Sequence, residues 1–169
     1  ICLVLAGLHP TPAQAAICTW TGAVSAVYTL ATNWDCGHAP GAADDVIIPN
    51  TTRHPTISSQ SVYTYATNFT IQPGGILEVT NGYRFELFFT GDVFNNGTIH
   101  TTTGADSNFF GFTSMDFGSQ FINNGVIDIY AGQLNAYFNT GATHTGTFAG
   151  QYGAIGFLGN PGADLTFTD

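Results

Sequence analysis

Positive charge is almost missing from this sequence. It contains no lysine, and Arg53 and Arg84 are the only fixed cations against 11 acidic residues, which gives a formal net charge of −9. Nucleic-acid-binding proteins need basic surfaces that neutralise phosphates, and anionic membrane surfaces attract basic segments. We therefore expect no nucleic-acid partner and no binding to a negatively charged membrane.

Helix signals are missing as well. Gly, Asn, Pro and Thr interrupt every window that could carry apolar residues at helical spacing, and these residue types are unfavourable inside helices. Short β-favouring runs alternate instead with Asn-Gly and Gly-Gly turns. The sequence therefore predicts an all-β protein, with strands around residues 46–48, 76–79, 85–89, 126–130 and 165–167.

Catalytic motifs are not found either. The sequence has no phosphate-binding loop, no Gly-x-Ser-x-Gly elbow and no His-Glu-x-x-His. Asp44 and Asp45 form an acidic pair, but neighbours on a strand point to opposite faces, so we interpret them as a turn entering a strand, with calcium binding as the alternative. We predict a protein that is not an enzyme, with no catalytic residues and no cofactor.

The N-terminus has the layout of an export signal. An apolar run over residues 1–8 precedes Ala13-Gln14-Ala15-Ala16, a small-x-small cleavage site. The run is too short to cross a bilayer, which takes roughly 20 residues. We interpret residues 1–15 as a secretory signal peptide, with a retained N-terminal strand as the alternative, and expect an extracellular or cell-surface location.

Cysteine is scarce and its positions are informative. Of Cys2, Cys18 and Cys36, only the last two lie outside the signal-like segment. In an exported protein, such a pair predicts a disulfide rather than free thiols.

A glycine-anchored phrase recurs along the chain. Residues 94–101 match residues 122–129, residues 138–145 form a weaker copy, and two further copies begin at Gly75 and Gly162. The predicted anchoring glycines are therefore Gly75, Gly97, Gly125, Gly141 and Gly162. Repeats of about 20 residues that end in a short strand indicate a β-solenoid. We expect it to cover residues 50–169 and to continue into, or pair with, another coil beyond Asp169.

Alternation along these strands assigns their faces. Positions two and four after each glycine should point inward; they are Leu77, Ile99, Ile127 and Thr143, then Val79, Thr101, Ile129 and Thr145. Positions three after each glycine should form an outward polar column of Glu78, His100, Asp128 and His144. These residue types suit a metal, but a flat stack does not converge four ligands on one point. We interpret the column as a solvated face, and expect the Asn residues before glycine to form turns and to bond from coil to coil.

The opening of the chain carries a family resemblance. The residues concerned are Thr19-Trp20-Thr21-Gly22, Asn33-Trp34, Gly37, Pro40-Gly41 and Asp44-Asp45-Val46-Ile47-Ile48-Pro49, followed by the Asn-Asn-Gly repeats. This pattern resembles exported bacterial β-solenoid surface proteins of the adhesin type, although Tyr28 stands where those proteins usually have Trp. The resemblance implies a single right-handed parallel β-helix, surface exposure and a structural or adhesive role.

Trp20 and Trp34 are the candidate capping residues. Each can bury a large area over the open end of the first coil, so residues 16–49 are predicted to be a capping segment held by the disulfide. Ordinary core packing is an equal alternative, and a sugar-stacking platform is a further one.

Three function classes follow, in order of preference. The first is a non-catalytic extracellular structural protein, a self-assembling filament subunit or adhesin segment. The second is a carbohydrate-binding module that uses Tyr63, Tyr65 and Phe109, and the third is a polysaccharide-active enzyme. The absence of lysine leaves strand edges without charged residues that discourage pairing, so we expect end-to-end self-association.

Overall fold

The computed structural model of the chain describes residues 15–58, 62–80, 85–102, 109–114, 120–138, 142–159 and 165–167. The signal-like residues 1–14, with Cys2, lie outside this part of the chain, as do Gly141 and Gly162. The first sheet has five parallel strands and is called face A. In spatial order its strands are β1 (Ile17–Thr19), β2 (Asp45–Ile48), β5 (Phe69–Ile71), β8 (Val93–Asn95) and β11 (Phe121–Asn123).

The second sheet is also parallel and supplies two further faces. Face B contains β3 (Thr56–Ile57), β6 (Ile76–Val79) and β9 (Thr98–Thr101). Face C contains β4 (Val62–Ala66), β7 (Phe85–Phe89) and β10 (Phe109–Ser114). The long strands β12 (Val126–Phe138) and β14 (Thr147–Gly159) run across both faces, because β12 pairs with β9 at its start and with β10 towards its end.

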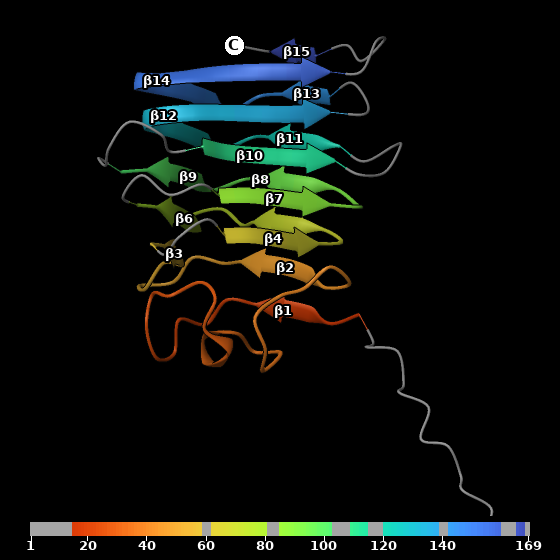
Figure 1. The fold of residues 1–169 in the computed structure, drawn as a ribbon, viewed down its shortest axis with the longest axis vertical. Helices are drawn as coiled ribbons and strands as arrows, with labels where there is room; N and C mark the ends of the chain where they lie inside the picture. The colour runs from red at the N-terminus through yellow and green to blue at the C-terminus, as the bar shows by residue number, and fades with distance from the viewer. Residues whose placement is uncertain are drawn as a thin grey trace, which may run out of the picture.

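The chain therefore passes from face A to face B to face C and then starts the next coil. Figure 1 shows these coils stacked along the long axis, with β1 at one end and β15 (Leu165–Phe167) at the other. The remaining strand, β13 (Ala142–His144), pairs with β15 and lies beside β11. This is an all-β, all-parallel arrangement of stacked sheets, consistent with the predicted solenoid-like architecture.

The core consists of columns of aligned side chains that run along the stack. On face B, the predicted inward residues are buried: Leu77, Ile99 and Ile127 form one column, and Val79, Thr101 and Ile129 form the next. On face A, one column contains Cys18, Val46, Phe69, Val93 and Phe121. The alternation predicted from the sequence for residues 76–79, 98–101 and 126–129 is confirmed.

Glycines stack at the turn between faces A and B, and there they are required for space. A Cβ on Gly97 would meet the carbonyl oxygen of Gly75, one on Gly125 that of Gly97, and one on Gly146 that of Gly125. The residue after each glycine donates its N–H to the glycine carbonyl one coil below, at 2.8–2.9 Å. These donors are Thr98, Val126 and Thr147. Stacked backbones leave no room here for a side chain.

This stack corrects one predicted repeat. The anchoring glycine of the fourth copy is Gly146, because Thr147 aligns with Val126 and Ala149 aligns with Asp128. The prediction placed it at Gly141, an odd number of residues earlier, which reverses inward and outward positions. His144, expected on the outward column, is 1% exposed, whereas Thr145, expected inward, is exposed.

Residues 15–44, called here the N-terminal segment, pack at the start of the stack. They contain β1 and a 3-10 turn, η1 (Ala31–Asn33), and they bond to β3 through Tyr28 N–H to Thr56 O and Thr56 N–H to Ala26 O. In Figure 1 this segment lies beyond β2 and β3, at the end opposite β15. Across the described residues, no helix is long and apolar enough to cross a membrane.

Substitution of Gly125 by Ala tests the glycine stack. The new methyl group would overlap the backbone of Gly97, so the free energy of unfolding should fall by about 1–3 kcal/mol. Gly41→Ala is the matched control, because its Cβ would meet only Asp44 Oδ2, at an ordinary 3.7 Å. Urea unfolding followed by circular dichroism measures both variants, and equal stabilities would contradict the stacking argument.

Candidate functional site

The disulfide joins β1 to the loop that follows η1 in the N-terminal segment. Cys18 on β1 and Cys36 after η1 are bonded, with Cα atoms 5.0 Å apart, as predicted from the sequence. Cys18 is fully buried and aligns with Val46 of the first coil, whereas Cys36 is only partly buried. The bond therefore ties a surface loop to the core column of face A.

Three aromatic side chains fill the interior of the segment. Trp34 packs edge-on against Trp20 and against Tyr28, with ring centroids 5.1 Å apart in both pairs. Both indole N–H groups donate 2.7 Å hydrogen bonds, from Trp20 to Arg53 O and from Trp34 to Tyr28 O. Trp20 is 1% and Trp34 3% exposed, so neither ring can serve as a sugar platform.

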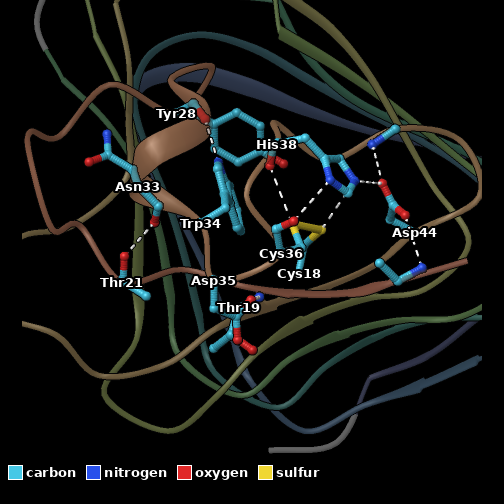
Figure 2. Close-up of a disulfide and its surroundings, with 12 residues drawn as sticks. Cys18, Thr19, Thr21, Tyr28, Asn33, Trp34, Asp35, Cys36, His38 and Asp44 are labelled. Atoms are coloured by element: carbon cyan, nitrogen blue, oxygen red, sulfur yellow. Dashed lines mark hydrogen bonds and ion pairs between the residues drawn. A yellow bond between two sulfur atoms is a disulfide. The ribbon is translucent and has the colours of Figure 1, made fainter.

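Asn33 organises the loop that carries these rings. Its side-chain oxygen accepts from the N–H groups of Val24 and Ser25 at 3.0 and 2.9 Å, and its amide nitrogen donates to Ser25 Oγ and Val27 O. Its backbone carbonyl accepts from the Thr21 hydroxyl at 2.8 Å, as Figure 2 shows. A buried amide that is satisfied in this way fixes one loop conformation.

A histidine–aspartate pair lies beside the disulfide and was not predicted from the sequence. His38 Nε2 is 3.0 Å from Asp44 Oδ2 and 3.7 Å from Cys18 Sγ, and its Nδ1 is 3.2 Å from Cys36 O (Figure 2). Asp44 also accepts hydrogen bonds from the N–H groups of Gly41 and Ala16, at 2.8 and 3.1 Å. Burial alone would raise the pKa of Asp44, but the bonds from Gly41, His38 and Ala16 outweigh it and hold this pKa below its ordinary value.

These contacts gather four ligand-type side chains in one place. The Sγ atoms of Cys18 and Cys36 and a ring nitrogen of His38 lie within 4.8 Å of one another, and Asp44 adjoins the histidine. In the sequence, only Cys-Gly-His at 36–38 could have indicated this cluster. The pairing of His38 with Asp44 depends on the turn at residues 41–44. Asp45, its sequence neighbour, instead accepts from Asn68 N–H and Nδ2.

The predicted outward column is shorter than expected. Glu78, His100 and Asp128 align on face B, and His100 Nδ1 lies 3.1 Å from Asp128 Oδ2 on the half-exposed surface. Glu78 Oε2 accepts a long, 3.5 Å hydrogen bond from Thr56, and the next aligned residue is Ala149 rather than His144. A pairwise His–Asp contact on a flat face agrees with the solvated-face interpretation.

The predicted glycan-contacting aromatics fall on face C. Tyr65 is 44% exposed and stacks on Phe88, with centroids 5.3 Å apart and an interplanar angle of 21°. The side chains of Tyr63 and Phe109 lie outside the described part of the structure.

Two asparagine ladders follow the stack, as the repeats predict. Inside face A, Asn95 Nδ2 donates to Asn123 Oδ1 at 2.7 Å, and Asn123 N–H donates to His144 Nδ1 at 3.1 Å. On the surface, Asn124 Nδ2 donates to Asn96 Oδ1 at 3.0 Å. Burial lowers the pKa of His144 below its ordinary value. The interior ladder therefore includes His144, where burial favours the neutral form of the imidazole.

Stacked parallel coils with a disulfide-locked N-terminal segment define the class of protein. A family profile described as Domain of unknown function (DUF8693) matches residues 19–107, which is more than half of the chain. The chain belongs to this family, and the match spans most of the N-terminal segment and the coils through β9. No curated protein and no solved structure showed a significant match.

Removal of the disulfide should destabilise the protein. The bond closes a loop with a sequence separation of 18, for which chain entropy predicts a stabilisation of about 3 kcal/mol. The double variant Cys18→Ser, Cys36→Ser should lose about that amount in urea unfolding. Wild-type protein that has been reduced and alkylated should lose a similar amount, and unchanged stability in both would contradict the bond.

His144 should make the fold sensitive to mild acid. Its pKa is lowered in the folded state from an ordinary 6.5, so below about pH 6.5 the unfolded chain binds a proton that the folded chain excludes. The free energy of unfolding should therefore decrease as pH falls from 6.5, whereas the contribution of Asp44 is lost only below its ordinary 3.8. His144→Asn keeps a hydrogen-bonding side chain in the ladder but removes the titratable group. In this variant the free energy of unfolding should depend less on pH just below 6.5.

The control is His100→Asn, which removes an imidazole from the outer face and retains His144. Urea unfolding at several pH values measures the slopes, and a flat wild-type profile between pH 6.5 and 5 would contradict this role of His144.

Proposed function

We propose that the chain is part of a non-catalytic extracellular structural protein, a surface adhesin segment or filament subunit built on a right-handed parallel β-helix. The observation that carries the proposal is the continuous coil stack. Its strand pairs are parallel throughout, and its interior columns are filled by aligned side chains from β2 to β11. Backbone hydrogen bonds that run along the axis in this way make a stiff rod, which suits a spacer or stalk.

The N-terminal segment supports an exported location. A disulfide persists in oxidising compartments, and here it joins the partly exposed Cys36 to the core residue Cys18. The segment that carries the buried aromatic residues lies at the start of the stack (Figure 1), where a solenoid needs a cover over its first coil. A segment of this kind suits a protein that works outside the reducing cytosol.

The stacked rings on face C favour a structural role over glycan binding. A sugar packs on an open aromatic face, but Tyr65 and Phe88 each cover a face of the other. Side-by-side rings with open faces would be expected of a sugar platform, whereas rings stacked from coil to coil stabilise the sheet itself.

A sheet edge supports self-association. The edge at β3 is bridged by Val27, but within the described residues β4 pairs only with β7. An unpaired strand edge is a template for another strand, and Tyr65 on β4 is a neutral, exposed side chain. We propose that copies of the chain associate through this edge.

A charged edge residue tests the association. Wild-type protein should sediment as oligomers at micromolar concentration with little dependence on salt, because strand pairing is not an ionic contact. Tyr65→Lys should shift the population towards monomer, since lysine on an edge strand discourages pairing. Val24→Lys makes a similar charge change at a 62% exposed site of the N-terminal segment and should leave the oligomers intact.

Analytical ultracentrifugation measures all three proteins, with circular dichroism to check that each is folded. A wild-type protein that stays monomeric at every salt concentration would overturn self-association through β4. Equal dissociation by both lysine variants would show that charge, and not the edge, controls assembly.

A further inference from the structure

The surroundings of the disulfide form a metal site that only the reduced protein can use. We infer that, once the bond between Cys18 and Cys36 is reduced, the chain binds Zn²⁺ through both Sγ atoms, His38 Nε2 and Asp44 Oδ2. Two thiolates, an imidazole and a carboxylate are ligands that zinc accepts in tetrahedral sites. The inference concerns the N-terminal segment alone and is independent of the proposed structural function.

Two pairs of ligand atoms already lie near tetrahedral separations. With Zn–S of about 2.3 Å and Zn–N and Zn–O of about 2.0 Å, neighbouring ligands should be about 3.5 Å apart for sulfur and nitrogen and about 3.3 Å for nitrogen and oxygen. Cys18 Sγ is 3.7 Å from His38 Nε2, and that nitrogen is 3.0 Å from Asp44 Oδ2. The two sulfur atoms must also move apart, which loss of their bond permits.

Backbone groups hold the two non-sulfur ligands in place. His38 Nδ1 faces Cys36 O at 3.2 Å, and because a carbonyl only accepts, Nδ1 must carry a hydrogen. Nε2 then faces a carboxylate oxygen, and two lone pairs at this distance need a proton or a metal ion between them. Metal-ligating histidines commonly donate their other N–H to a backbone carbonyl, and here Gly41 and Ala16 orient the carboxylate in the same way.

Access to the site comes from the solvent side. The His38 side chain is 50% exposed, Cys36 is partly exposed, and Cys18 and Asp44 are buried beneath them. A cation can therefore bind the His38 imidazole first. It can then replace its bound water molecules with the buried ligands Cys18 and Asp44.

The chemistry balances with a dithiol as the reductant. The dithiol supplies two electrons and two protons, the Sγ–Sγ bond breaks, both cysteines become thiols, and the dithiol closes to its own disulfide. When Zn²⁺ binds, each thiol releases its proton to solvent as a Zn–S bond forms. Reoxidation would expel the metal, since a disulfide offers no thiolate.

Metal uptake by the whole chain tests the site. Protein is reduced with a dithiol, freed of it by gel filtration under nitrogen, and dialysed against Zn²⁺ or Co²⁺. The reduced wild type should bind about one Zn²⁺ per chain, and its Co²⁺ form should show thiolate charge-transfer absorption. The oxidised wild type should bind at least about tenfold more weakly.

Single-ligand variants make the assignment specific. Reduced His38→Gln and Asp44→Asn should each bind zinc about tenfold or more weakly, while His100→Asn on face B should bind like the wild type. The inference is overturned if reduced wild type takes up no more zinc than Cys18→Ser, Cys36→Ser. It is equally overturned if His38→Gln and Asp44→Asn leave affinity unchanged, since the cysteines would then bind metal without the folded site.

Discussion

Close approach of backbones at the turn between faces A and B is the constraint on which the rest of the structure depends. Gly97, Gly125 and Gly146 each occupy a position where a Cβ would strike the carbonyl of the glycine one coil below. The next residue in each coil donates to that same carbonyl, so steric and hydrogen-bonding requirements fix one register. The inward columns, the asparagine ladders and the His100–Asp128 contact all follow from that register.

A second column on face A, which begins at Ile48, changes from apolar to polar along the stack. Ile48 and Ile71 give way to Asn95, Asn123 and then His144 at equivalent places. Apolar side chains tolerate small shifts between coils, but a buried amide left without its partner costs about 1–3 kcal/mol. The polar half of the column therefore specifies coil spacing more strictly than the apolar half, and it makes this region of the core respond to pH.

The N-terminal segment has a different role, because within the described residues it, and not another coil, packs against the first coil. Trp20, Tyr28 and Trp34 pack as edge-on rings with satisfied indole donors, and the disulfide ties them to β1. The same closure brings His38 and Asp44 against the sulfur atoms. The N-terminal segment thus holds both the disulfide that stabilises it and the side chains of the proposed metal site.

Local patterns in the sequence determined that the chain forms strands and that Cys18 and Cys36 form a disulfide. They also determined which residues point inward and outward in 76–79, 98–101 and 126–129. Alternation and cysteine count predict these features because neither depends on distant contacts. They misplaced His144, because Asn-Thr-Gly at 139–141 resembles the true turn at Gly146 and only stacking on Gly125 distinguishes the two. The His38–Asp44 pair could not be predicted from the sequence either, because it forms only when the turn at 41–44 packs against the folded disulfide loop. Tertiary structure decided these points because the position of a short polar segment depends on the residues that it packs against after folding.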